Sequence, residues 1–196
     1  MVYEQKNFDN LIGTAGFSEQ LLKNHFTLYQ GYVTNTNKLA EILSSMIKEG
    51  IAGTPQYAEL KRRFGWEFNG MMLHEYYFGN MARNSVSFDK NSKLFKKLIE
   101  EFGSYENWEK DFKAMALMRG IGWVILYYDL INKRLFNVWV NEHDTGHLSG
   151  AIPILVLDVF EHAFMIDYGL KRADYIEAFF KAVDWNVVQQ RFEAAQ

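Results

Sequence analysis

Cysteine is absent from the 196-residue chain, and its absence excludes several kinds of chemistry. A disulfide framework, thiolate metal ligands and a catalytic thiol are all ruled out, so any metal must be bound through nitrogen and oxygen. No hydrophobic run is long enough to span a membrane, and the start of the sequence lacks the pattern of a cleavable signal. With 48% hydrophobic residues the chain can bury a substantial core, and we expect a soluble, cytoplasmic protein.

A basic stripe of the kind that neutralises phosphates is also lacking. The formal net charge is −3, and Lys and Arg are interspersed with Asp and Glu along the sequence. Aromatic residues make up 16% of the chain, but the aromatic run at 64–68 has helical spacing, which favours core packing over base stacking. We therefore expect neither a nucleic acid nor a membrane as a partner.

The N-terminal part has the hydrophobic spacing of two long helices. These are predicted at about 17–47 and 55–83, joined by a turn at 50–54. Thr54 and Pro55 are typical of a helix cap and a first-turn residue. The first part of the chain is therefore predicted to be a helical hairpin.

The C-terminal part mixes helices with short strands. A new pattern begins near Ser92 and includes a helix at 105–118, and Asn132-Lys133 is a suitable turn between two strands. We predict an α+β fold with a small three-stranded antiparallel sheet, divided into a hairpin domain at 1–88 and an α+β domain at 89–196. The other predicted elements are strands at 123–128, 135–140 and 152–157 and helices at 175–183 and 185–192.

A carboxylate and an imidazole lie four residues apart, as Asp158 and His162, at the end of the apolar run 152–157. Imidazole nitrogen and carboxylate oxygen together suit iron, manganese and zinc. The structural alternative is that Asp158 caps the following helix and His162 is a core histidine. This spacing alone favours the structural alternative.

The chain has only five histidines, and His25 and His74 each interrupt the apolar face of a predicted long helix. A single inward-facing histidine is more often structural than functional. Two of them on separate helices, together with Asp158 and His162, form a four-ligand set. The sequence therefore predicts a metal site that joins the two parts of the chain.

The sequence resembles the iron/manganese superoxide dismutases over nearly its whole length. The resemblance is carried by Asp-Val-Phe-Glu-His-Ala-Phe at 158–164, Gly-Ile-Gly-Trp at 120–123, Tyr-Val-Thr-Asn-Thr-Asn at 32–37 and Asp-Trp at 184–185. It implies one iron or manganese ion per chain, with a solvent molecule as fifth ligand, and the conversion of superoxide to dioxygen and hydrogen peroxide. The implied protein ligands are His25, His74, Asp158 and His162.

The surroundings of the ligands depart from the family pattern. Gly70 stands where many iron enzymes of the family have a glutamine, and we expect that space to be empty. Manganese enzymes bring a glutamine from the approach to the third strand, where ungapped counting places Glu142 with His143 beside it. We favour His143 over Glu142 as the residue that hydrogen-bonds the metal-bound solvent, since an imidazole can donate a hydrogen bond as glutamine does, with His147 in reserve. The alternative is a solvated turn at 141–144.

The first helix differs from the family in its funnel residues. Tyr29 stands four residues after His25, where the family has a histidine, and Val33 stands eight after it, where the family has a tyrosine. Tyr32 lies one residue early, and we expect it to reach the site as a catalytic residue if the helix contains a local irregularity. Met165 replaces a second aromatic residue of the funnel.

Two charged residues match functional positions of the family. The resemblance implies that Arg172 attracts anionic superoxide, and that Glu161 contacts the partner's His162 in a homodimer, with tetramers also possible. The alternatives are a surface arginine and an ordinary first-turn glutamate.

Three functions are weighed from the sequence. Superoxide dismutase is favoured because all four ligands are present, although the ligands do not decide between iron and manganese. A structural or assembly protein that kept the fold and lost the chemistry is the main alternative. A non-haem iron oxygenase would use two histidines and one carboxylate, and here a third imidazole leaves too few open positions.

Overall fold

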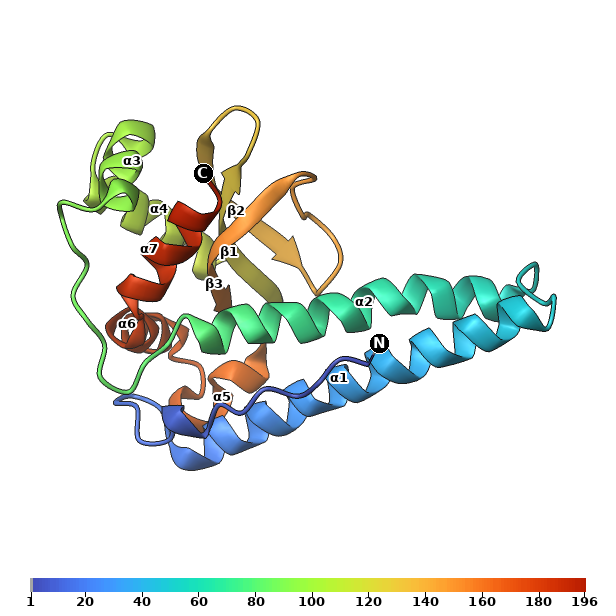
Figure 1. Cartoon of the computed structure of the whole chain (residues 1–196). Coiled ribbons are helices and arrows are strands. Elements are labelled where there is room, and N and C mark those ends of the chain that lie inside the picture. The colour runs from blue at the N-terminus through green and yellow to red at the C-terminus, as the bar shows by residue number, and fades with distance from the viewer. Residues whose placement is uncertain (1) are drawn as a thin grey trace.

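The computed structural model describes residues 2–196, and its N-terminal part is a long helical hairpin preceded by an extended segment (Figure 1). Helices α1, Glu19–Lys48, and α2, Pro55–Gly79, form its two arms, and the side chain of Thr54 accepts a hydrogen bond at the start of α2. Both long helices are confirmed. Helix α2 ends four residues earlier than predicted, because Met81 pairs with Val183 in an isolated β-bridge.

The C-terminal part contains a three-stranded antiparallel sheet in the order β2-β1-β3. Each strand extends one residue beyond its predicted range at both ends, and the α+β fold is confirmed. In the central strand, Trp123 lies opposite Val140 of β2 and Asp158 of β3, which places the indole next to the end of β3. The strands are β1 (Gly122–Asp129), β2 (Arg134–Asn141) and β3 (Ala151–Asp158).

Residues 2–196 contain five further helices after the hairpin. Ser92 and Ser104 cap the first two of them, since each side-chain oxygen accepts a backbone hydrogen bond from the first turn. The sequence pattern that begins near Ser92 predicts a separate helix only at 105–118, so the helix at 93–102 is an addition from the structure. The helices are α3 (Lys93–Phe102), α4 (Tyr105–Ala116), α5 (Met165–Tyr168), α6 (Arg172–Ala182) and α7 (Trp185–Ala194), with short 3₁₀ turns η1 (Asp9–Leu11) and η2 (Glu161–Ala163).

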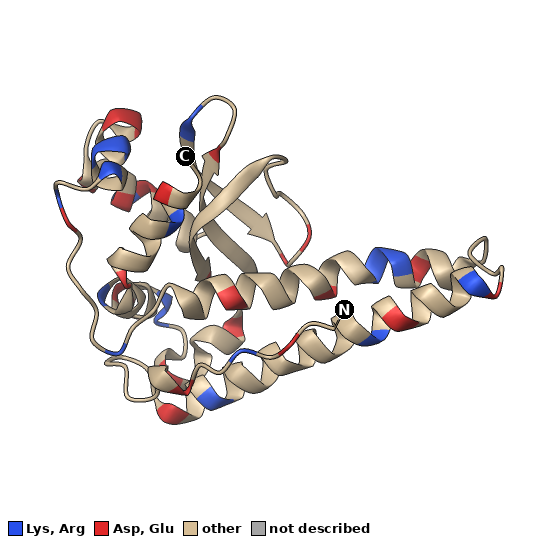
Figure 2. Cartoon of the chain, in the orientation of Figure 1, with Lys and Arg blue, Asp and Glu red and all other residues tan. Residues whose placement is uncertain are grey.

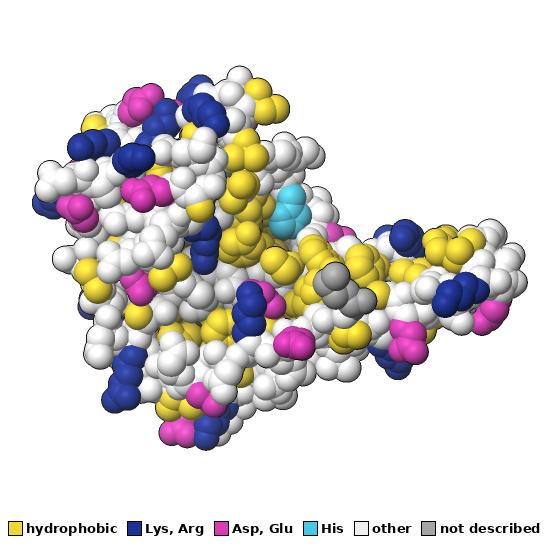
Figure 3. All heavy atoms as spheres, in the orientation of Figure 1, with side chains coloured by type: hydrophobic (Ala, Val, Ile, Leu, Met, Phe, Trp, Pro, Cys, Tyr) yellow, Lys and Arg dark blue, Asp and Glu magenta, His cyan; other side chains and the backbone are white. Residues whose placement is uncertain are grey.

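Hydrogen bonds fix the hairpin against the sheet where the predicted ligands lie. At the end of α2, the Asn80 amide donates to the carbonyl oxygen of Val156 on β3 at 2.5 Å, and its oxygen accepts from Arg191 of α7 at 2.7 Å. Hydrophobic side chains gather in the crease between the hairpin and the C-terminal part on the face shown in Figure 3. The relative positions of α2 and β3 are therefore set by both polar and apolar contacts.

Basic and acidic residues are mixed along the ribbon of the chain (Figure 2). This distribution agrees with the sequence, in which no basic stripe was found.

Within residues 2–196, no helix combines the length and the apolar character that crossing a bilayer requires.

Candidate metal centre

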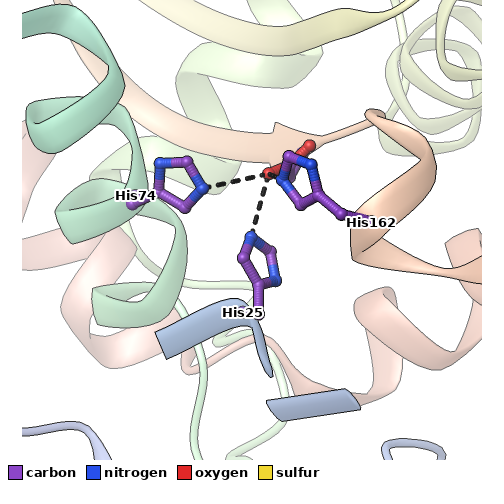
Figure 4. Close-up of side chains that lie close together, drawn as sticks. His25, His74 and His162 are labelled. Atoms are coloured by element: carbon purple, nitrogen blue, oxygen red, sulfur yellow. Dashed lines mark hydrogen bonds and ion pairs between the residues drawn. The ribbon is translucent and has the colours of Figure 1, made fainter. Parts of the chain in front are cut away.

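Four side chains from separate elements converge at the junction of the hairpin and the sheet. His25 comes from α1, His74 from α2 and His162 from the η2 turn (Figure 4). Asp158 is the last residue of β3. One potential ligand atom from each lies within 4.8 Å of the others. His25, His74 and Asp158 are buried, and the His162 side chain, at 25% exposed, is the most accessible of the four.

The two oxygens of Asp158 have different partners. Its Oδ2 lies 3.1 Å from His25 Nε2 and 3.2 Å from His162 Nε2, and its Oδ1 accepts a hydrogen bond from the Phe160 amide at 2.8 Å. Burial opposes ionisation of Asp158, but the charge and hydrogen bond of His162 and the hydrogen bond of His25 outweigh it and hold the pKa of the carboxyl below its usual range. Asp158 is therefore an anion at the centre of the cluster.

His74 presents an unpaired lone pair to this anion. Its Nδ1 lies 2.6 Å from the carbonyl oxygen of Gly70 and donates to it, so Nε2 carries no hydrogen. That Nε2 is buried without a hydrogen-bond partner and lies 3.6 Å from Asp158 Oδ2. Two hydrogen-bond acceptors facing each other inside a protein repel, and a cation between them removes the repulsion. The arrangement of donor atoms therefore fits a bound metal ion.

A chain of three side chains lies beside His74. The indole Nε1–H of Trp123 donates to Nδ1 of His143 at 3.0 Å, and Nε2 of His143 lies 2.8 Å from the hydroxyl of Tyr32. The Tyr32 ring stacks on the His74 ring with 5.1 Å between centroids. His143 is fully buried, and burial lowers its pKa to about 4, so its ring is neutral at pH 7.

The space next to Gly70 is not empty, contrary to the expectation from the sequence. A Cβ atom at Gly70 would lie 2.6 Å from Cδ1 of Tyr32, so the tyrosine ring occupies the volume that a larger residue would need. Tyr32 lies beside the cluster without the local irregularity that was its condition, since α1 is a regular α-helix through this region. Residues seven apart fall on the same helical face two turns along, and Tyr32 reaches the site on the face of His25.

Glu142 and His147 have partners outside the cluster. Glu142 is exposed, its backbone has φ +50°, and its carboxylate accepts a hydrogen bond from Trp66 Nε1 at 3.1 Å. His147 bonds the Tyr127 hydroxyl at 2.7 Å and donates to the carbonyl oxygen of His143 at 2.9 Å. Of the three residues considered from the sequence, the structure brings only His143 next to Tyr32.

Arg172 and Glu161 lie at the edge of the site. Nη1 of Arg172 donates to the carbonyl oxygens of Met118 and Gly120 at 3.1 and 3.2 Å, and burial lowers the pKa of its guanidinium. The Glu161 side chain is exposed at the η2 turn, and Met165 is 39% exposed near it.

The funnel positions of the first helix point elsewhere. Tyr29 is buried, and its hydroxyl donates to Glu75 at 3.0 Å and accepts from the Lys6 amide at 3.0 Å. Val33 is part of the core. Neither side chain belongs to the group of polar residues around His143.

Several residues of the site were not assigned a role from the sequence. The Tyr175 hydroxyl donates to the carbonyl oxygen of Asp158 at 2.7 Å and lies 3.0 Å from the hydroxyl of Tyr77. The Trp66 ring lies 4.4 Å from the His143 ring. Aromatic spacing on helices indicates only core packing, so no sequence signal distinguished these side chains from ordinary core residues.

Comparison with known proteins gives one consistent result. Residues 90–191 match the family model of the iron/manganese superoxide dismutase C-terminal domain. Manganese superoxide dismutase 2 of Haloferax volcanii is 39% identical over 179 residues, covering 91% of this chain and 88% of the relative. The chain belongs to the iron/manganese superoxide dismutase family.

Iron and manganese members of the family are similarly close to this chain. The iron superoxide dismutase of Aquifex aeolicus is 35% identical over 92% of this chain and 86% of its own length. That of Cupriavidus metallidurans is 36% identical over 100% of this chain and 98% of its own length. The relatives therefore identify the family and leave both metals open.

Proposed function

We propose that the protein is a superoxide dismutase that uses one iron or manganese ion per chain. The convergence of three imidazole nitrogens on one carboxylate oxygen, with the unpaired Nε2 of His74 among them, supports this function most strongly. Membership of the iron/manganese superoxide dismutase family supports the substrate. His25, His74, Asp158 and His162 hold the ion in this proposal.

When bound, the ion would supply one-electron chemistry, by which one superoxide is oxidised to dioxygen and a second is reduced and takes up two protons to give hydrogen peroxide. The protein residues bind the ion, limit access and supply hydrogen bonds. Burial of His25 and His74 lowers their pKa values and keeps both rings neutral, as metal coordination requires. Tyr175 holds the backbone of Asp158 and so orients its carboxylate.

Arg172 is proposed to attract the anionic substrate. Its Nε and Nη2 are buried without hydrogen-bond partners among residues 2–196, while Nη1 holds the segment that leads into β1. A cation at the edge of the cluster favours approach of superoxide in spite of the formal net charge of −3.

We also propose a homodimer in which Glu161 contacts the partner's His162. The exposed position of Glu161 and the partial exposure of the His162 side chain are consistent with such a contact. Exposed apolar residues flank the same region and would be covered by a second copy. They are Leu117, Met118, Ile121, Met165 and Leu170.

We also propose that the chain divides into a hairpin domain at 1–88 and an α+β domain at 89–196, and that each domain supplies two of the four ligands.

The assignment is tested by substituting His74 and measuring metal content by elemental analysis. His74→Ala is expected to remove stoichiometric iron or manganese and superoxide consumption together, because one ligand of four is lost. His147→Ala is the matched control, since His147 bonds the Tyr127 hydroxyl and the His143 carbonyl oxygen and none of the four ligands, and it should keep its metal. Full activity in metal-replete His74→Ala would refute the assignment, and a parent protein without metal would favour the structural alternative.

A further inference from the structure

The hydrogen-bonding capacity of His143 is fully used within the described chain. A neutral imidazole has one donor nitrogen and one acceptor nitrogen. The indole Nε1–H of Trp123 is only a donor and lies 3.0 Å from His143 Nδ1, so Nδ1 must be the acceptor. The ring hydrogen is therefore on Nε2, which lies 2.8 Å from the Tyr32 hydroxyl and donates to it.

This order of donors leaves the hydroxyl hydrogen of Tyr32 free. The Tyr32 oxygen accepts from His143, and the hydroxyl has no second hydrogen-bond partner among residues 2–196. The Tyr32 ring stacks on the ring of His74, a member of the metal cluster, which places the tyrosine beside the ligands.

Neighbouring rings restrict the His143 imidazole. Phe160 stacks on it at 4.7 Å between centroids, and Trp66 contacts it edge-on at 4.4 Å. The ring cannot rotate to present a different nitrogen without displacing these side chains.

We propose that His143 is a positioning residue that directs the Tyr32 hydroxyl, and that the hydroxyl hydrogen of Tyr32, not an N–H of His143, is the hydrogen bond offered to solvent or superoxide at the metal. Gly70 is part of the same arrangement, since a side chain there would displace the Tyr32 ring. The role toward superoxide rests on the proposed function, whereas the order of hydrogen bonds does not.

A glutamine would not be equivalent to His143. Its amide has one acceptor oxygen and two N–H groups. After accepting from Trp123 and donating to Tyr32, a glutamine would still have one N–H free for the metal side, and the histidine has none. The histidine therefore offers one hydrogen bond fewer.

The order of hydrogen bonds is tested by long-range ¹H–¹⁵N correlation spectra of the full-length, metal-free protein labelled with ¹⁵N-histidine. The His143 signals are identified by their loss in His143→Gln. We expect a hydrogen on Nε2 alone, in the parent and in Tyr32→Phe, because Trp123 sets the tautomer and phenylalanine keeps the ring packing. A hydrogen on Nδ1, or on both nitrogens, would overturn the proposal whether or not the protein is a dismutase.

The consequence for the metal is tested by the midpoint potential of the metal-loaded protein. His143→Gln would add a free N–H that can donate a hydrogen bond to the solvent ligand. Such a donor stabilises hydroxide, the ligand of the oxidised metal, more than water, so we expect a lower midpoint potential than in the parent. An unchanged potential would mean that His143 already supplies this hydrogen bond and would contradict the proposal. If the parent protein bound neither iron nor manganese, the proposed function would be refuted, but the NMR result on the order of hydrogen bonds would still hold.

Discussion

Gly70 and Tyr32 provide a test of how the site is packed. In an open helical position, replacing glycine by alanine stabilises a protein by about 0.8–1 kcal/mol, because glycine loses more backbone entropy on folding. At Gly70 the new Cβ would lie 2.6 Å from Tyr32 Cδ1, and overpacking of this kind costs about 1–3 kcal/mol. We expect Gly70→Ala to be destabilising by up to about 2 kcal/mol once both effects are added.

Gly65 is the matched control, because it lies on the same helix and an added Cβ would meet no atom within 4 Å. Gly65→Ala should raise the free energy of unfolding by about 1 kcal/mol. Urea unfolding of the metal-free variants measures both changes without stabilisation by bound metal. Combining Gly70→Ala with Tyr32→Ala should remove the clash, which a double-mutant cycle detects. Equal stabilisation by Gly70→Ala and Gly65→Ala would refute the packing argument.

Three further predictions follow from buried hydrogen bonds, ionisation and the surface. Tyr175→Phe should lower the free energy of unfolding by about 1–3 kcal/mol, measured in urea, since the buried Asp158 carbonyl loses its donor; an unchanged value would show that Asp158 is held by other contacts. Burial lowers the pKa of His143 from 6.5 to about 4 in the folded protein. Between these two pH values the unfolded chain binds more protons than the folded protein, so the free energy of unfolding decreases as the pH falls from 6.5 to about 4. His143→Gln should lose less stability than the parent between pH 7 and pH 4, and equal losses would contradict the lowered pKa. Glu161→Ala should shift the proposed dimer toward monomer in sedimentation velocity, and a parent that sediments as a monomer would exclude the dimer.

The fold was predictable because its periodic patterns are unambiguous. Two helical periods, three short β-branched runs and the Thr54-Pro55 cap located the hairpin and the sheet to within a few residues. The positions of His25 and His74 on inward helix faces also predicted that they would meet. Periodicity places a residue on a face, and the faces of two packed helices are brought together by the core.

The neighbours of the ligands could not be predicted in the same way. Counting residues back from Asp158 selected Glu142, but the bridge between Asn141 and Thr145 and the left-handed backbone of Glu142 direct that side chain away and bring His143 inward. The contact of Tyr32 with Gly70 depends on the distance between α1 and α2, which no spacing within one helix determines.

The central claim is that the buried His/Asp cluster holds a metal that reacts with superoxide. We would measure metal content by elemental analysis together with superoxide consumption, on the same protein loaded separately with iron and with manganese, and express activity per bound ion. We predict about one ion per chain and superoxide consumption with at least one of the two metals. Stoichiometric metal without superoxide consumption in either form would contradict the account.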